Sequence, residues 1–466
     1  MESRSASTRL PGLLAATAMG VYLLVLVGAT VALTDATSAC SSFPACGDGW
    51  ALPDTADGWV ALGHRVVAVV VGLLGAATAV TAISDRPSRR VLSALALAGV
   101  LYPAQAMLGA IVASVGGDGT LSAIHLGLGV TIFAALVLAL AWTLELRTGD
   151  PDEEPTGMPE RDLPPEGERT PTIPDDPLTR AVATGKAYLA LTKPRLMWLL
   201  CLVAVAGMAL AAGTTLSART VALTLGGGVL SIGASGTFNH VLERDIDRRM
   251  ERTSDRPLPS DLIPVRNALT FGLALALGSL VLFAAVNWLV ALLGLIAIAF
   301  YSVVYTLILK PNTVQNTVLG GAAGALPALI GWAAVTGEVG LGGLALATLI
   351  FLWTPAHFYN LAMAYKDDYE RGGFPMLPVV RGETETRKHV LLYLGATFVV
   401  AAALATIPGL GVAYLLAAVG VGALFLWAVV RLHYEQTERA AMRAFHASNA
   451  YLGAVLLAVV IDTLVI

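Results

Sequence analysis

Two clusters of polar residues stand where long apolar stretches end, and the first lies in NHVLERDIDRRMERTSDRPL, which begins at Asn239. Asn239, Glu243 and Asp247 are spaced by four, so a continuing helix places them on one face, whereas Asp245 lies on another. Mg²⁺ prefers oxygen ligands and typically combines one or two protein carboxylates with substrate phosphates. The spacing therefore predicts a site for Mg²⁺ and a phosphorylated ligand.

Arginines crowd the same segment, and their guanidinium groups suit phosphate oxygens. They are Arg244, Arg248, Arg249, Arg252 and Arg256. A second interpretation of these arginines alone is a solvated loop that only sets the orientation of the chain in a membrane. The second acidic cluster makes that interpretation less attractive for the set of Asn239, Glu243 and Asp247.

The second cluster is HFYNLAMAYKDDYERGGFPMLP, which begins at His357. Helical spacing brings His357 and Asn360 to a common face with Asp367 or Asp368, and this face reaches from the polar end into the apolar stretch. Polar residues at such depth are costly in a membrane and are usually functional. Two acidic helix ends on one side of a membrane are what a two-metal diphosphate clamp needs. A chance cluster at the membrane surface is the alternative.

The elements that must position these residues are membrane helices. The 466 residues are 56% hydrophobic and 13% charged, whereas a soluble domain carries about 25% charged residues. A helix needs about 20 apolar residues to cross a bilayer. Thirteen such runs lie near 11–34, 59–83, 91–115, 121–145, 195–213, 219–240, 267–286, 288–309, 315–335, 341–365, 390–407, 410–430 and 448–466. The pattern predicts an all-α, polytopic membrane protein, a four-helix bundle followed by a nine-helix bundle.

A polar segment separates the two sets of runs. Between 150 and 177 the chain holds eight prolines and ten carboxylates, has almost nothing to bury, and is expected to be an exposed, extended linker. The predicted domains are therefore 1–147 and 181–466, joined by a linker at 148–180. The first apolar run lacks a clear cleavage site, so no cleavable signal peptide is expected.

The basic residues predict how the chain lies in the cell membrane. With a cytoplasmic N-terminus, all of the 29 Lys and Arg except Arg65 and Arg219 fall on the inner side, in agreement with the positive-inside rule. Both acidic clusters then face the cytoplasm, and the C-terminus lies outside. The net charge of −4 indicates little about partners other than the lipid bilayer, and no nucleic-acid partner is expected.

Five segments resemble the UbiA-type intramembrane prenyltransferases and, within them, the heme O synthases, which farnesylate protoheme IX. They are LTKPR at 191–195, NHVLERDIDRRMERTSDRPLPS at 239–260, YTLILK at 305–310, GGAAGALPALIGWAAVTG at 320–337 and YKDDYERGGFPMLPVVRG at 365–382. They occur in the family's order, and the nine-helix count also fits. Glu243 is a departure because aspartate is common there, although glutamate can still ligate Mg²⁺.

The resemblance implies a reaction in which a vinyl group of heme b attacks the allylic cation of farnesyl diphosphate and water completes heme O. Metal and basic groups would stabilise the negative charge that develops on the leaving diphosphate. The implied catalytic residues and Mg²⁺ ligands are Asn239, Glu243, Asp247, Asp367 and Asp368. The implied substrate-binding residues are Lys193, Arg195, Arg252, Arg256, Lys310, His357 and Asn360. For His357, a heme contact or proton carrier and a hydrogen-bonded position within the bundle are both open.

The first predicted domain contains two histidines at matching depth. His64 and His125 each lie about five residues inside the outer end of a predicted helix, which corresponds to roughly 7 Å at 1.5 Å per residue. Two histidines at one level of a four-helix bundle can supply both axial ligands of a heme. Cys40 and Cys46 lie in the outer loop, where a disulfide is permitted; two reduced thiols are the alternative.

CSSFPACGDGW together with the later GHR resembles one half of heme A synthase, a family built from two four-helix halves. The family's catalytic glutamate, expected three residues before the first histidine, is Ala61. The resemblance therefore implies a heme-binding module without heme A synthase activity. Such a module could present heme b to the second domain, associate with heme A synthase, or pair with a second copy.

Three other functions compete with heme farnesylation. The first is a UbiA-type prenyltransferase acting on a quinone precursor or a lipid, against which the PMLPVVRG and LTKPR segments argue. The second is a transporter, whose acidic residues should lie near the middle of the membrane instead of at one interface. The third is a non-catalytic heme carrier, which the complete carboxylate set disfavours. The farnesyl chain length follows only from the resemblance, and geranylgeranyl stays open.

Overall fold

The protein is described by a computed structural model, which covers residues 9–33, 40, 43–46, 52–115, 119–159 and 176–465. Within these ranges the regular structure is helical and contains no strand. Thirteen helices of the described residues are long and apolar enough to cross a membrane, which confirms the predicted fold class and the number of runs. The chain divides into two compact units, one made of Met1–Pro151 with Arg387–Gln436 and the other of Asp152–Thr386 with Thr437–Ile466.

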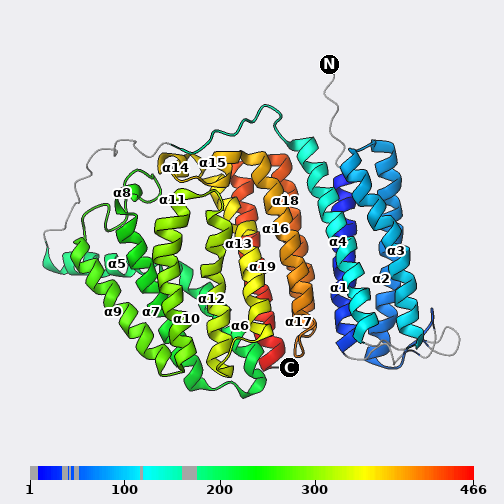
Figure 1. The fold of residues 1–466 in the computed structure, drawn as a ribbon, viewed down its shortest axis with the longest axis horizontal. Helices are drawn as coiled ribbons and strands as arrows, with labels where there is room; N and C mark the ends of the chain where they lie inside the picture. Colours follow the sequence, from blue (N-terminus) through cyan, green and yellow to red (C-terminus); the bar gives the residue numbers. More distant parts are fainter. Residues whose placement is uncertain are drawn as a thin grey trace. The chain divides into compact units, whose positions relative to one another are not determined.

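The first unit contains a four-helix bundle (Figure 1). Its helices are α1 (Arg9–Leu33), α2 (Ala56–Asp85), α3 (Arg89–Val115) and α4 (Gly119–Thr148). The same unit takes in most of α16 (Glu383–Leu404), α17 (Val412–Leu416), η4 (Ala417–Val421) and α18 (Gly422–Glu435).

Contacts between the four-helix bundle and residues 387–436 hold the first unit together. The ring of Tyr22 stacks on Phe398 with centroids 4.6 Å apart, and Lys388 pairs with Glu145 at 2.7 Å. Helices from the predicted second domain thus pack with the first bundle, a grouping that the sequence did not suggest. The boundaries of the functional domains stay a prediction.

The second unit contains the helices that surround the predicted site (Figure 1). The long ones are α5 (Pro177–Leu191), α6 (Pro194–Ala212), α7 (Ala218–Leu242), α9 (Val265–Ala284), α10 (Trp288–Ala299), η3 (Phe300–Leu309), α12 (Asn316–Thr336), α13 (Leu341–Ala364) and α19 (Glu438–Leu464). The short ones are α8 (Arg244–Asp247), α11 (Lys310–Asn312), α14 (Lys366–Arg371) and α15 (Leu377–Arg381). The short helices gather at the end of the unit where α7 and α13 finish.

Small residues allow α6 and α12 to approach each other closely. A Cβ added at Gly331 would lie 2.1 Å from the carbonyl oxygen of Ala204, and one added at Gly207 would lie 2.6 Å from that of Ala328. Such contacts are typical of membrane bundles, in which helices associate largely by close packing. The glycine pair therefore fixes one wall of the unit.

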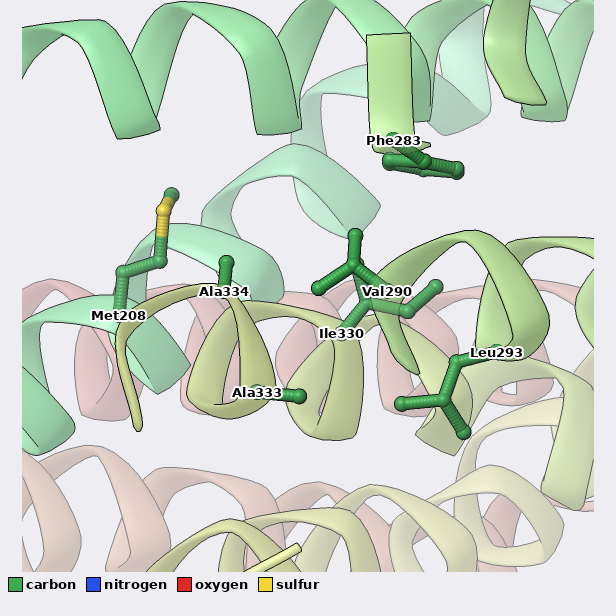
Figure 2. Close-up of a cluster of buried hydrophobic side chains, with 7 residues drawn as sticks. All are labelled: Met208, Phe283, Val290, Leu293, Ile330, Ala333 and Ala334. Carbon is green, nitrogen blue, oxygen red and sulfur yellow. The ribbon is translucent and has the colours of Figure 1, made fainter. Parts of the chain in front are cut away.

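An apolar cluster fills the end of the unit opposite the short helices. Figure 2 shows its side chains, which come from α6, α9, α10 and α12. They are Met208, Phe283, Val290, Leu293, Ile330, Ala333 and Ala334. Burial of each large side chain of this kind contributes about 1.5–3 kcal/mol, so the cluster anchors these helices together.

Polar chemistry sets the starts of two helices that the apolar runs did not predict: α19 begins earlier than its expected run, and α5 begins inside the expected linker at 148–180. The side chain of Thr437 accepts a hydrogen bond from the backbone N–H of Ala440 and begins α19 at Glu438, ten residues before the run expected at 448–466. Asp176 caps α5 in the same way, and Pro177 occupies its first turn. Such caps stabilise helix starts that a hydropathy window does not detect.

Candidate active site

A cavity of about 870 Å³ lies within the second unit and is lined by α6, α7, α10, η3, α12 and α13. Helix α7 contributes one continuous face, along which the lining residues recur every three or four positions. They include Thr224, Gly228, Ser231, Ser235 and Asn239, followed by Glu243 just past the end of the helix. This period is that of one face of an α-helix, so α7 lines the cavity over nearly its whole length.

The predicted carboxylate–amide set lies together at one end of the cavity. Asn239, Glu243 and Asp247 all line it and are 1%, 3% and 2% exposed. The short helix α8 follows α7 directly: the backbone N–H of Glu243 donates to the carbonyl of Asn239 at 2.9 Å, and that of Asp247 donates to the carbonyl of Glu243 at 2.7 Å. The four-residue spacing therefore does place these three side chains along one line.

Each member of this set has a basic partner. The Lys310 ammonium pairs with Glu243 at 2.6 Å, and Nη1 of Arg256 donates to both oxygens of Asp247 at 2.9 and 2.7 Å. The Lys193 ammonium donates to the side-chain oxygen of Asn239. Buried charges are tolerated when they are paired in this way.

Lys193 reaches the site from a backbone conformation that is uncommon for its residue type. Its φ of 54° and ψ of 55° lie in the left-handed region, immediately before the first residue of α6. The stem of its side chain crosses Gly236, where an added Cβ would lie 3.2 Å from Cγ of Lys193. Non-glycine residues persist in this region only when the surroundings hold them there, and such residues cluster at functional sites.

Two tyrosines missed by the sequence analysis also line the cavity. Tyr301 and Tyr305 project from the π-helical segment η3, in which Thr306 donates its hydroxyl to the carbonyl of Tyr301 at 2.8 Å. Lys193 donates to the Tyr301 hydroxyl at 3.1 Å, and the Asn239 amide donates to Thr306 at 3.0 Å. Tyrosines four apart inside an apolar run were the available signal, but the π-helix has no recognisable pattern.

The arginines of the loop after α8 have different environments. Arg252 and Arg256 line the cavity, as does Arg195 from the start of α6. Arg244 and Arg248 instead close the loop by pairing with Asp261 at 2.5 and 3.0 Å. The arginines of this segment therefore divide between the cavity lining and the ion pairs that close the loop.

Asp368 supports this loop from outside the cavity. Its carboxylate accepts hydrogen bonds from the backbone N–H groups of Glu251 and Arg252 at 2.7 and 3.2 Å, and it pairs with Arg371 at 2.7 Å. Neither Asp368 nor the exposed Asp367 lines the cavity. In this conformation the structure therefore differs from the expected two-sided clamp, because the second acidic helix end positions the Arg252 loop.

His357 and Asn360 also lie away from the cavity lining. The imidazole of His357 is stacked between Trp353 and Phe445, with centroids 4.3 Å away in each case, and lies 2.7 Å from the hydroxyl of Ser448. Asn360 is fully buried and donates to the carbonyl of Ala356 at 2.7 Å. Of the two roles open for His357, this geometry matches the position within the bundle.

The electrostatics of the charged end follow from burial and neighbouring charges. Burial lowers the pKa of Lys193 to about 8, and the nearby charge of Arg256 acts in the same direction. Burial alone would raise the pKa of Glu243, but Lys310 and Lys193 hold it below its usual value. For Asp247 burial dominates and raises the pKa, because Arg256 offsets it only in part. The Asp247 carboxylate therefore has room for further cationic stabilisation.

The donor set of this end fits Mg²⁺ bound together with a diphosphate. Among the residues that the structure describes, no three His, Cys, Asp or Glu side chains converge as a complete metal site. Two carboxylates and one amide are available, and Mg²⁺ usually takes one or two carboxylates and completes its shell with phosphate oxygens and water. The residues that would hold the ion are Asn239, Glu243 and Asp247.

In the first unit, His64 lies on α2 and His125 on α4. Nδ1 of each ring is buried and has no hydrogen-bond partner within the described part of the chain. Cys40 and Cys46 form a disulfide, which packs against the buried Ala61.

Sequence comparison identifies the family of the chain. Residues 200–452 match the model of the UbiA prenyltransferase family. The chain is 64% identical over 464 residues to a protein of Haloquadratum walsbyi named protoheme IX farnesyltransferase, covering 98% of this chain and 97% of that protein.

The chain belongs to the UbiA prenyltransferase family.

Other comparisons concern parts of this prenyltransferase. A protoheme IX farnesyltransferase 1 of Saccharopolyspora erythraea is 46% identical over 283 residues, which are 60% of this chain and 90% of that protein. A solved digeranylgeranylglyceryl phosphate synthase shares the fold, with a TM-score of 0.52 and 18% identity over 61% of this chain and all of that one. Residues 54–162 match the model COX15-CtaA, described as a cytochrome oxidase assembly protein, consistent with the resemblance seen in the first bundle.

Proposed function

We propose that this prenyltransferase transfers the farnesyl group of farnesyl diphosphate to a vinyl group of protoheme IX and so forms heme O. The observation that carries the proposal is the charged end of the cavity, where buried Glu243 and Asp247 face Lys193, Arg256 and Lys310. Close relatives named protoheme IX farnesyltransferase support the choice of substrates. Quinone precursors and lipids remain the competing acceptors.

Bound Mg²⁺ would neutralise the diphosphate and assist its departure. With the diphosphate bound beside Asn239, Glu243 and Asp247, the cations of Lys193, Lys310 and Arg256 would stabilise the negative charge that develops on the leaving group. The carbon–oxygen bond of farnesyl diphosphate breaks, and the freed allylic carbon forms a bond with the terminal vinyl carbon. Water then adds to the inner vinyl carbon and loses a proton, which gives the hydroxyethylfarnesyl group. The rings of Tyr301 and Tyr305 can stabilise the allylic cation through their faces.

The proposal is tested by expressing the full chain in a host that lacks heme O synthase and analysing extracted hemes and quinones by mass spectrometry. We expect heme O to accumulate and the quinones to be unchanged. Absence of heme O from cells with folded protein and abundant heme b would refute the proposal, and new prenylated quinones would favour the competing acceptor.

We further propose that the chain is a multi-pass protein of the cell membrane, with its N-terminus inside and its C-terminus outside. In this orientation the charged end of the cavity faces the cytoplasm. The distribution of basic residues supports this orientation. Single cysteines placed at exposed Asp245 and at Thr336, beyond opposite ends of the bundle, test it with an impermeant thiol reagent. Labelling of the Thr336 site alone in intact cells is expected.

The first bundle is proposed to bind heme b between His64 and His125. The two imidazole nitrogens that lack a partner in the described part of the chain support a ligand-binding role, since buried polar atoms normally have partners. With heme bound, this bundle could present the heme to the second unit, associate with heme A synthase, or pair with a second copy of the chain. Absorption spectra of the purified protein, with and without His64→Ala, test the ligation.

A further inference from the structure

The end of the cavity remote from the charges is apolar. Its lining there includes Ala204, Leu225, Phe283 and Ile330, and two of these belong to the buried cluster of Figure 2. Along α7, twelve residues separate Asn239 from Gly227, which corresponds to about 18 Å at 1.5 Å per residue. A prenyl chain whose diphosphate lies at Asn239 would therefore point its far end toward Phe283.

Phe283 cannot easily move out of this position. Its side chain is 1% exposed, and its ring lies between two glycines on different helices. A Cβ added at Gly227 of α7 would lie 2.6 Å from the ring, and one added at Gly294 of α10 would lie 2.3 Å from it. Figure 2 shows the ring facing the side of the cluster that holds Val290 and Ile330. Only glycine on both walls leaves room for the ring.

From this geometry we infer that Phe283 sets the maximum length of the prenyl chain that the cavity accepts. The inference rests on the proposed function and adds the residue that distinguishes farnesyl from longer chains. With the ring present, a fourth isoprene unit meets an aromatic wall that is fixed between two helices. Without it, neither Gly227 nor Gly294 has a side chain to fill the vacated slot, so the chamber becomes deeper in the direction of the chain.

The test uses the full chain in detergent with heme b, Mg²⁺ and either farnesyl or geranylgeranyl diphosphate, with the products measured by mass spectrometry. We expect the wild type to prefer the farnesyl donor by at least about tenfold in kcat/KM, because even one extra methylene in an apolar pocket is discriminated about 10–200-fold. Phe283→Ala is expected to reduce this preference at least about tenfold, mainly by improving use of the geranylgeranyl donor. Phe283→Leu opens the slot less and serves if the alanine variant folds poorly.

Two further variants separate chain-length selection from general loosening of the core. Leu293→Ala removes a side chain from the same buried cluster but not from the cavity lining, so it should leave the donor preference unchanged. Gly294→Ala combined with Phe283→Ala refills part of the slot and should restore much of the preference for farnesyl.

The outcomes distinguish this inference from the proposed function. A wild type that prenylates no heme with either donor overturns the proposed function. If the wild type makes heme O and the Phe283 variants have the same donor preference as the wild type, the role of Phe283 is overturned and the proposed function stands. If Leu293→Ala changes the donor preference as much as Phe283→Ala does, the role of Phe283 is also overturned, because loosening of the core would then explain the change.

Discussion

The two candidate sites of this chain treat buried polar groups in opposite ways. In the second unit, Glu243 and Asp247 are almost completely buried, and each pairs with a basic side chain. In the first unit, one nitrogen of His64 and one of His125 are buried without a partner among the described residues. A buried carboxylate left unpaired is far more costly than a neutral imidazole nitrogen left unpaired.

This difference indicates how each site would accept its ligand. In the second unit, the charged groups already neutralise one another before a ligand binds. On binding, the carboxylates of Glu243 and Asp247 would leave Lys310 and Arg256 and bind the metal ion. Lys310 and Arg256 would then bind the phosphate oxygens. A heme entering the first unit would supply a partner to imidazole nitrogens that have none among the described residues. The first site is therefore expected to gain stability on binding, and the second mainly to gain reactivity.

The strongest test of this comparison is Asp247→Asn. The substitution removes a negative charge from the proposed metal site and leaves Arg256 without its ion-pair partner. We expect the rate of heme O formation to fall about 10²–10³-fold, the range found when one preorganised electrostatic contact is removed from an active site. Initial rates in membranes, normalised to folded protein, provide the measurement.

Asp245→Asn is the matched control, because Asp245 is 83% exposed on the adjoining face of the same short helix. Its rate should stay close to that of the wild type. Full activity in Asp247→Asn would contradict the metal site, whereas equal losses in both variants would indicate a general dependence on charge.

A smaller effect is expected from Asp368→Asn, which tests whether the second acidic cluster binds metal or positions the Arg252 loop. Loss of the hydrogen bonds to Glu251 and Arg252 should misplace the arginine and lower kcat/KM about tenfold. If Asp368 only positions the loop, the Mg²⁺ concentration for half-maximal rate stays unchanged. A marked increase in that concentration would instead support the two-sided clamp. Asp367→Asn is the control, since Asp367 is exposed and outside the cavity.

These tests depend on a site that sequence reasoning recovered only in part. The spacing of Asn239, Glu243 and Asp247 was sufficient to place them along one line, because an α-helix imposes the period. Lys193 and Lys310 come from distant segments, and their expected roles derived from family resemblance. Their pairing with Asn239 and Glu243 depends on how α6, η3 and α7 pack, which no local pattern specifies.

For the fold as well, local sequence patterns predicted the helices, whereas contacts between distant segments were not predictable. Thirteen apolar runs predicted thirteen helices long enough to cross a membrane, because a bilayer demands a minimum apolar length. The grouping of residues 387–436 with the first bundle was not predictable. It depends on contacts such as Tyr22 with Phe398, which are separated by most of the chain.

For the first unit, His64→Ala is expected to abolish the absorption of a bis-histidine heme while leaving the rate of heme O formation nearly unchanged. The physical reason is that one axial ligand is lost from the four-helix bundle, whereas the charged cavity is not altered. His446→Ala is a suitable control because His446 is exposed and outside both sites. A heme spectrum that persists in His64→Ala would contradict the proposed ligation, and a parallel collapse of heme O formation would show that the second unit needs the heme of the first.

The smallest effect on catalysis is expected from Cys40→Ser, which opens the disulfide to Cys46. Closing a loop with a sequence separation of 6 restricts the unfolded chain and stabilises the folded one by about 2 kcal/mol. The variant should therefore lose the heme of the first bundle at a lower denaturant concentration, while heme O formation in native membranes stays unchanged. Slower heme O formation in Cys40→Ser would contradict the comparison of the two sites. It would show that catalysis in the second unit depends on the stability of the first bundle.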